Sequence, residues 1–188
     1  MQSHKIYDYI ERLSNLLRND SRRGIAEFGL QPIQLEALHY LSICNRYSDT
    51  PMAVTEYLGQ TKGTVSQTLK VLEKKGLLSR HVDSHDKRVT HLQVTAAGQT
   101  VLQASIPSPL FMQACTGLSA ASQQEIESTL EKLLCTLQHS NNMKTFGVCG
   151  SCGYNQKNQD GSYLCQLTRE PLTSAEVQLI CREHLAAA

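Results

Sequence analysis

The order of hydrophobic patterns between residues 30 and 103 limits what this chain can fold into more than any other feature. Apolar residues at three- and four-residue spacing predict a helix whose first turn contains Pro32. A hydroxyl cap at Thr50 predicts a short second helix. Thr61 is the expected N-cap of a third helix, which should end at Gly76 because glycine adopts the left-handed conformation easily.

A hairpin follows the third helix. Residues 79–95 are SRHVDSHDKRVTHLQVT, in which two short arms flank a tip rich in turn-forming residues. Thr95 then begins another helix. Helix, short helix, helix and hairpin is the order of a winged helix-turn-helix. We therefore expect a mainly α fold with a two-stranded β-wing.

Amphipathic helices flank this central unit. One apolar stripe runs from Ile6 to Leu17 and another from Ile126 to Leu137, and the small central lobe cannot cover both. Prolines at 107 and 109 should break or kink the helix that begins at Thr95. The predicted organisation is a helical dimerisation region formed by residues 1–29 and 104–145, a DNA-binding domain at 30–103, and a cysteine tail at 146–188.

Charge is concentrated on the central unit. The whole chain has a net charge of +1, which excludes a strongly polycationic protein. Seven cations and only three anions lie between residues 60 and 92, however, and such a patch favours DNA through counterion release. The cations are Lys62, Lys70, Lys74, Lys75, Arg80, Lys87 and Arg88, and the anions are Glu73, Asp83 and Asp86.

The third helix is the candidate recognition helix. With Val65, Leu69 and Leu72 in the core, its other face presents hydroxyls, an amide and lysines that can bond base edges or phosphates. An ordinary solvated helix face is the alternative. The predicted DNA-binding residues of this helix are Thr61, Lys62, Thr64, Ser66, Gln67 and Lys70.

The sequence resembles the MarR family of bacterial transcription regulators over roughly residues 4 to 140. The ordered set of motifs is more specific than any one of them. It consists of Leu30-Gln31-Pro32-Ile33-Gln34, Thr64-Val65-Ser66, Leu72-Glu73-Lys74-Lys75-Gly76-Leu77, Asp86-Lys87-Arg88, Leu92-x-Val94-Thr95-x-x-Gly98 and Leu118-Ser119 with Glu125.

This resemblance implies a homodimer that binds double-stranded DNA, with each recognition helix in a major groove and each wing in the adjacent minor groove. By position, Arg88 is the minor-groove residue, Asp86 is its orienting partner and Lys87 lies between them. A polar turn with a weak surface ion pair is the alternative. Repression is commoner in the family than activation, and family members often hold small aromatic effectors between the dimer lobe and the winged lobe.

Three histidines flank the wing, namely His81, His85 and His91. Protonated imidazoles there could contact phosphates, but we expect solvated strand residues. Three further cysteines, Cys44, Cys115 and Cys135, have apolar neighbours, and we expect each to be buried as a small hydrophobic residue.

The tail has the spacing C-x2-C-x12-C-x15-C, formed by Cys149, Cys152, Cys165 and Cys181. C-x2-C places two thiolates on one tight turn, and two more cysteines complete a four-sulfur metal site. The predicted cofactor is one such centre per chain, either an iron–sulfur cluster or Zn²⁺, since thiolates suit both. His184 could replace one thiolate, although a role beside the ligands or a solvated position is the stronger expectation.

The two metals have different consequences. Zinc would be a structural staple, because so short a segment buries little core. A cluster would be a sensor, and because the tail directly follows the last amphipathic helix, its loss could change the separation of the two recognition helices. We therefore expect a MarR-type regulator controlled through the metal centre. The alternatives are a regulator that responds to a small molecule and has a zinc staple, or a metal-containing protein-interaction module.

Other functions are excluded by missing signals. The sequence has no glycine-rich phosphate loop, no H-E-x-x-H motif and no nucleophile elbow, so we expect no enzymatic activity. No apolar run approaches the roughly 20 residues of a membrane span, and the opening MQSHKIYDYIER lacks the apolar region of a secretory signal. We expect a cytoplasmic protein without a membrane partner.

Overall fold

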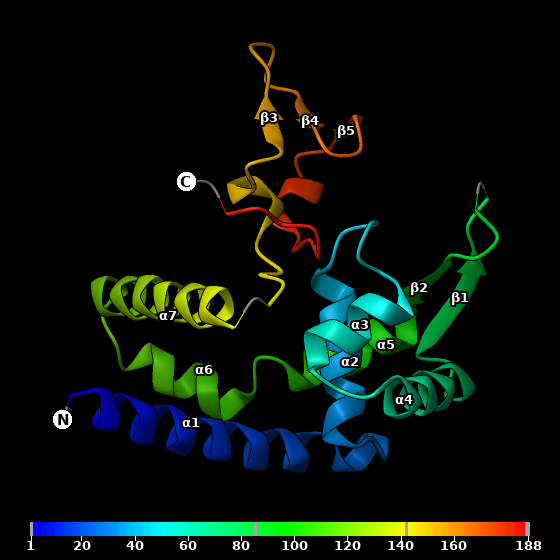
Figure 1. Ribbon diagram of the computed structural model, residues 1–188. Coiled ribbons are helices and arrows are strands. Elements are labelled where there is room, and N and C mark those ends of the chain that lie inside the picture. The colour runs from blue at the N-terminus through cyan, green and yellow to red at the C-terminus, as the bar shows by residue number, and fades with distance from the viewer. Residues whose placement is uncertain (1, 85, 142, 187–188) are drawn as a thin grey trace.

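The computed structural model describes residues 2–84, 86–141 and 143–186 (Figure 1). Its central part, residues 30–103, is called the winged lobe below. The lobe contains α2 (Pro32–Ile43), α3 (Pro51–Leu58), α4 (Lys62–Lys74), β1 (Leu78–Val82), β2 (Thr90–Val94) and α5 (Ala96–Ser105). The two strands pair antiparallel, with Leu78 opposite Val94 and Val82 opposite Thr90. The predicted mainly helical fold with a two-stranded wing is confirmed.

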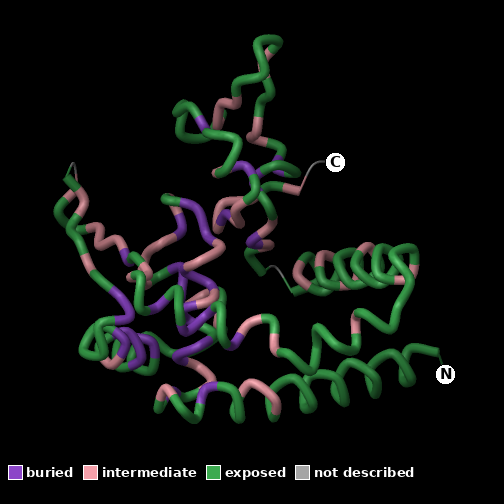
Figure 2. Tube along the Cα trace, turned by 180° about the vertical axis from the view of Figure 1, so that it is seen from behind, coloured by how far each residue is buried: buried purple, intermediate pink, exposed green. Residues whose placement is uncertain are grey.

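Local signals set these elements. The hydroxyl oxygen of Thr50 accepts a hydrogen bond from the amide of Ala53, and that of Thr61 accepts one from the amide of Thr64. Gly76 has a φ of +71°, which ends the turn after α4 without strain. Apolar side chains from all the helices and both strands of the lobe then form one continuous core, in which Leu38, Leu69 and Leu72 are fully buried. Figure 2 shows buried residues concentrated in this lobe.

The helical ends are α1 (Gln2–Gly24), α6 (Pro109–Thr116) and α7 (Ala120–Ser140), which extend to one side of the lobe (Figures 1 and 2). A short 3-10 turn, η1 (Ala26–Phe28), joins α1 to the lobe. None of the described residues of α1, α6 or α7 is buried within the single chain. Instead of a simple break after α5, residue Ser108 caps the additional helix α6. No helix in the described part of the chain is long and apolar enough to cross a bilayer.

The cysteine tail forms a small sheet that the sequence did not predict. Strands β3 (Asn155–Lys157), β4 (Tyr163–Cys165) and β5 (Glu170–Leu172) pair antiparallel in that order. Two 3-10 turns, η2 (Cys149–Ser151) and η3 (Glu176–Gln178), lie before and after the sheet. The tail contacts the winged lobe beside the loop between α2 and α3 (Figure 1).

Candidate functional site

The polar face of α4 lies on the surface. All six residues predicted to contact DNA from this helix are exposed, while Val65, Leu69 and Leu72 point into the core. The hydroxyl of Thr61 lies 2.9 Å from that of Thr64, so these two groups already serve the helix cap. Lys62, Ser66, Gln67 and Lys70 therefore provide most of the uncommitted hydrogen-bonding groups of this face.

The wing presents one guanidinium into solvent. The side chain of Arg88 is 90% exposed, and its Nη2 lies 2.8 Å from Oδ2 of Asp86. Its Nε and its own backbone amide both donate to Oδ1 of Asp86, each at 3.0 Å. These hydrogen bonds lower the pKa of Asp86 and raise that of Arg88. Asp86 thus fixes the direction of Arg88, as the resemblance implies, and Lys87 beside it is exposed.

A groove of about 440 Å³ connects the helix and the wing. Its walls come from α3, α4 and both wing strands, and Lys62, Ser66, Arg80 and Arg88 are among its lining residues. Arg80 is paired with Glu73 at 3.0 Å. Predicted contacts from α4 and from the wing therefore border one concave, cationic surface, which suits the phosphate-lined surface of a duplex.

One wing histidine, His91, differs from the solvated strand residues that the sequence predicted. His91 is largely covered, with Nδ1 2.6 Å from Asp49 and Nε2 3.2 Å from Asp83, so the prediction is wrong for this residue. His81 is exposed and stacks on His91 with ring centroids 5.3 Å apart. His85 lies outside the described residues. Sequence reasoning missed the contact between His91 and Asp49, because the two residues are 42 positions apart.

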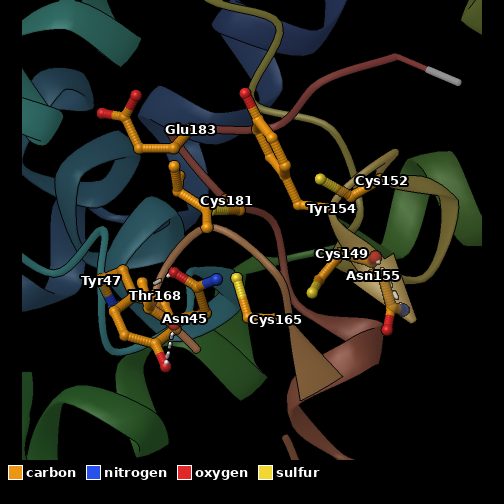
Figure 3. Close-up of a pocket in the computed structure, with 11 residues that line it drawn as sticks. Asn45, Tyr47, Cys149, Cys152, Tyr154, Asn155, Cys165, Thr168, Cys181 and Glu183 are labelled. Atoms are coloured by element: carbon orange, nitrogen blue, oxygen red, sulfur yellow. Dashed lines mark hydrogen bonds between the residues drawn. The ribbon is translucent and has the colours of Figure 1, made fainter. Parts of the chain in front are cut away.

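The four tail cysteines line one cavity of about 30 Å³ (Figure 3). Cys149, Cys152 and Cys181 are buried, and Cys165 on β4 is half-buried. Burial, followed by the nearby thiols of Cys181, Cys152 and Cys165, raises the pKa of Cys149 to about 11. Within the described residues, no three His, Cys, Asp or Glu side chains are already arranged to hold a metal ion. The structure therefore gathers the predicted ligands around one cavity without arranging them as a formed metal site.

Donor chemistry determines what this cavity can hold. Four sulfur donors suit thiophilic metals such as zinc or the iron of a cluster, and they do not suit Mg²⁺ or Ca²⁺. His184 does not line the cavity, since its ring lies 2.9 Å from the hydroxyl of Thr145 and 3.2 Å from that of Ser151. Burial lowers the pKa of His184. This half-buried histidine is neither solvated nor directed at the sulfur atoms.

Two residues from outside the tail also line the thiol cavity. They are Asn45 and Tyr47, from the loop between α2 and α3. Sequence reasoning missed both, because no local pattern marks a loop residue for contact with a segment more than a hundred positions away.

The remaining cysteines do not line the cavity. Cys44 is buried, as predicted, and burial raises its pKa to about 12. Cys115 on α6 and Cys135 on α7 are only half-buried in the single chain, so the prediction of full burial is wrong for both.

Comparisons with known proteins match these features. Residues 28–89, from η1 to the wing, match the sequence model of the MarR family. The transcriptional repressor MprA of Escherichia coli K12 is 28% identical over 126 residues, which cover 66% of this chain and 71% of that protein.

Solved structures of Staphylococcus aureus MepR have a similar fold. MepR in its DNA-binding conformation has a TM-score of 0.60 and 27% identity, covering 70% of this chain and 98% of that one. The MepR–DNA complex has a TM-score of 0.56 and 26% identity, covering 69% and 97%. The winged lobe is thus similar to the winged helix of MarR-family proteins, and about 30% of this chain lies outside these structural alignments.

Proposed function

We propose that this chain is a MarR-type transcriptional regulator that binds a pseudo-palindromic DNA operator as a homodimer and represses transcription. The observation that carries the proposal is the shared groove, in which Lys62 and Ser66 of α4 and Arg88 of the wing border one cationic surface. A solved MepR–DNA complex with a similar fold supports a duplex as the partner. The repressor function of the Escherichia coli relative supports repression.

Exposed apolar surface on the helical ends supports the dimer. Ile6, Leu13, Leu130 and Leu134 are each about half exposed although they belong to apolar stripes. A soluble monomer rarely leaves stripes of this length uncovered, and a second copy related by a two-fold axis would cover them. The two recognition helices would then meet half-sites about one helical turn, roughly 34 Å, apart.

A second cavity is a candidate effector site. It has a volume of about 510 Å³ and lies between α2, α3 and α7, where Tyr57, Leu134, Leu137 and Phe146 provide apolar walls. His39 and Glu56 add polar groups. A small aromatic molecule would fit these apolar walls and polar groups. Because the cavity lies between the winged lobe and the helical ends, a bound molecule could change the angle between these two parts.

The DNA proposal is tested by fluorescence anisotropy with duplex DNA from the chain's own upstream region. Arg88→Ala should weaken binding by about 1–3 kcal/mol, and Lys70→Ala should lower the salt slope by about one unit if this lysine contacts a phosphate. Lys157→Ala, on the exposed β3 of the tail, is the matched control and should leave both quantities unchanged. A wild-type chain that binds no DNA more tightly than random duplex would reject the proposal and favour a protein-interaction module.

A further inference from the structure

The cysteine tail is fixed to the winged lobe through the α2–α3 loop, residues 44–50. Ile180, which precedes Cys181, donates its amide proton to the carbonyl of Ile43 and accepts a hydrogen bond from the amide of Asn45, both at 2.9 Å. On its other edge, Ile180 bridges to Val148, which precedes Cys149. Backbone contacts therefore tie two of the four cysteines to the start of the loop.

Charged side chains reinforce this attachment in both directions. The guanidinium of Arg182 makes a bidentate pair with Glu56 on α3 at 2.6 and 2.8 Å, and its amide donates to the hydroxyl of Ser48 at 2.8 Å. From the loop, Arg46 pairs with Glu170 and with Glu176 of the tail. Bidentate arginine–carboxylate pairs fix geometry as well as adding attraction.

The loop forms part of the wall of the thiol cavity. Asn45, only 2% exposed, lines the cavity, and its Oδ1 accepts hydrogen bonds from the hydroxyl of Ser48 and the amide of Tyr47. Figure 3 shows Asn45 and Tyr47 facing the same space as the cysteines. Whatever fills the cavity therefore touches the residues that set the shape of the loop.

The other end of the loop holds the wing. The carbonyl of Asp49 accepts a hydrogen bond from the amide of Leu92 on β2 at 2.8 Å. Its carboxylate bonds His91, whose other ring nitrogen lies 3.2 Å from Asp83 at the end of β1. Arg88 lies three residues before His91 in the chain, so the wing that presents it rests on Asp49.

We propose that Cys149, Cys152, Cys165 and Cys181 bind a thiolate-held metal centre, and that filling this centre locks the α2–α3 loop and through it the wing, so that DNA affinity depends on the metal. This inference rests in part on the proposed function, since its biological output is DNA binding. On filling, each ligating thiol gives up its proton to solvent and bonds the metal as a thiolate. A zinc ion and an iron–sulfur cluster share this chemistry.

The small apolar core of the tail explains why an empty metal centre should release the α2–α3 loop. Among the described residues, the tail's buried cluster consists of Cys149, Leu172 and Val177, with Tyr163 and Cys165 partly buried against it. A segment with so little apolar core depends on a metal for its order. Without the metal, the contacts of Ile180 and Arg182 with the lobe should open, and Asp49 should lose its fixed position beneath the wing. This route runs through the wing, whereas chain adjacency alone suggested a route through α7.

The first experiment measures metal and spectrum on the full chain purified without oxygen. One zinc per chain in a colourless protein identifies a zinc site, and iron with inorganic sulfide and visible absorption identifies a cluster. Cys149→Ser/Cys152→Ser should lose the metal, whereas Cys115→Ser and Cys135→Ser should retain it. Metal-free wild-type protein that binds neither added Zn²⁺ nor a reconstituted cluster would overturn the inference.

The second experiment tests the coupling. Stripping the metal from the wild-type dimer should weaken operator binding about tenfold, within the usual range of coupling between sites. Glu56→Gln keeps all four cysteines but loosens Arg182, so the filled variant should retain its metal and bind DNA with a smaller difference between its filled and stripped forms. Equal affinities of filled and stripped wild-type dimers would reject the coupling while leaving the DNA proposal intact.

Hydrogen exchange separates the two proposals. Stripping should speed exchange of the amides of Asn45 and Leu92, which donate to Ile180 and Asp49 respectively, whether or not any DNA is bound. If the chain binds no operator in either state, the function proposal fails, and this measurement alone decides the inference. Unchanged exchange at both amides would then overturn it.

Discussion

The winged lobe and the cysteine tail are both small units, but they are held together by different means. The lobe closes a continuous apolar core from six elements, with Leu38, Leu69 and Leu72 fully buried. In its described part, the tail has three short strands and a buried cluster of three residues, one of them a cysteine. The lobe can therefore be stable through burial alone, whereas the tail has little apolar core and is attached to the lobe by hydrogen bonds and ion pairs.

The largest effect should come from removing two thiols of the tail. In Cys149→Ser/Cys152→Ser, the tail should lose its order, because structural thiolate–zinc sites contribute about 10 kcal/mol of apparent binding free energy. Limited proteolysis should then cleave within residues 147–186, while the cooperative unfolding of the lobe persists. If the tail of the variant resists protease as well as that of the wild type, its polar contacts alone keep it ordered. The proposed difference between the lobe and the tail would then be wrong.

Two leucines of opposite burial should give the next largest effect. Leu69→Ala empties a fully buried site of the lobe and should cost about 2–5 kcal/mol of unfolding free energy. Leu167→Ala, at a tail side chain that is 49% exposed, should change stability by less than about 0.5 kcal/mol. Urea denaturation followed by circular dichroism measures the unfolding free energy of both variants. Similar losses of unfolding free energy would contradict the view that burial stabilises the lobe but not the tail.

Two glycines sharpen the comparison further. A Cβ at Gly98, in α5, would lie 2.4 Å from the backbone carbonyl oxygen of Leu77, so Gly98→Ala should cost about 1–3 kcal/mol. A Cβ at Gly147 would meet the ring of His184 at 2.5 Å. That ring can rotate at the expense of its contacts with Thr145 and Ser151, so Gly147→Ala should cost about 1 kcal/mol or less. Thermal unfolding of the two variants tests whether Gly98→Ala is the more destabilising. If the tail is the more rigid unit, Gly147→Ala should destabilise more.

The sequence predicted the lobe because its signals are local. Thr61 caps α4 a few residues before the first buried position, and Gly76 ends the same segment, so each boundary was visible in a short window. The four cysteines were likewise recognisable from spacing, and the structure brings them around one cavity. The assignment of individual residues to DNA contacts and of the sulfur atoms to a metal stays a prediction.

The attachment of the tail could not be predicted, because its partners are distant in sequence. Arg182 and Glu56 are 126 positions apart, and each looks like an ordinary solvated charge in its own segment. Ile180 uses backbone groups, which carry no side-chain signal at all. The three-stranded sheet of the tail was missed for a related reason, since strands of three residues are too short to show alternation.

The smallest effect should be the pH dependence of the contact that joins the loop to the wing. Hydrogen bonding to Asp49, opposed by partial burial and aided by Asp83, raises the pKa of His91 above its ordinary value of 6.5. The protonated form is thus favoured in the folded chain, so its stabilising contribution is complete below about pH 6.5 and is lost as the pH rises through the raised pKa. Burial raises the pKa of Asp49, against the hydrogen bond from His91, which lowers it. His81, which stacks on His91, is the other titratable ring facing it.

His91→Gln keeps a hydrogen-bonding side chain but cannot titrate, so it isolates this contribution. The unfolding free energy of the wild type should exceed that of His91→Gln by about 1 kcal/mol near pH 6, and the difference should shrink towards pH 9. Histidines remote from His91 and the thiols are common to both proteins, so their titration cancels in the difference. A difference that stays constant from pH 6 to pH 9 would mean that His91 supports the wing as a neutral hydrogen-bonding group. In that case the loop would hold the wing through the backbone hydrogen bond from Leu92 to Asp49, which does not titrate.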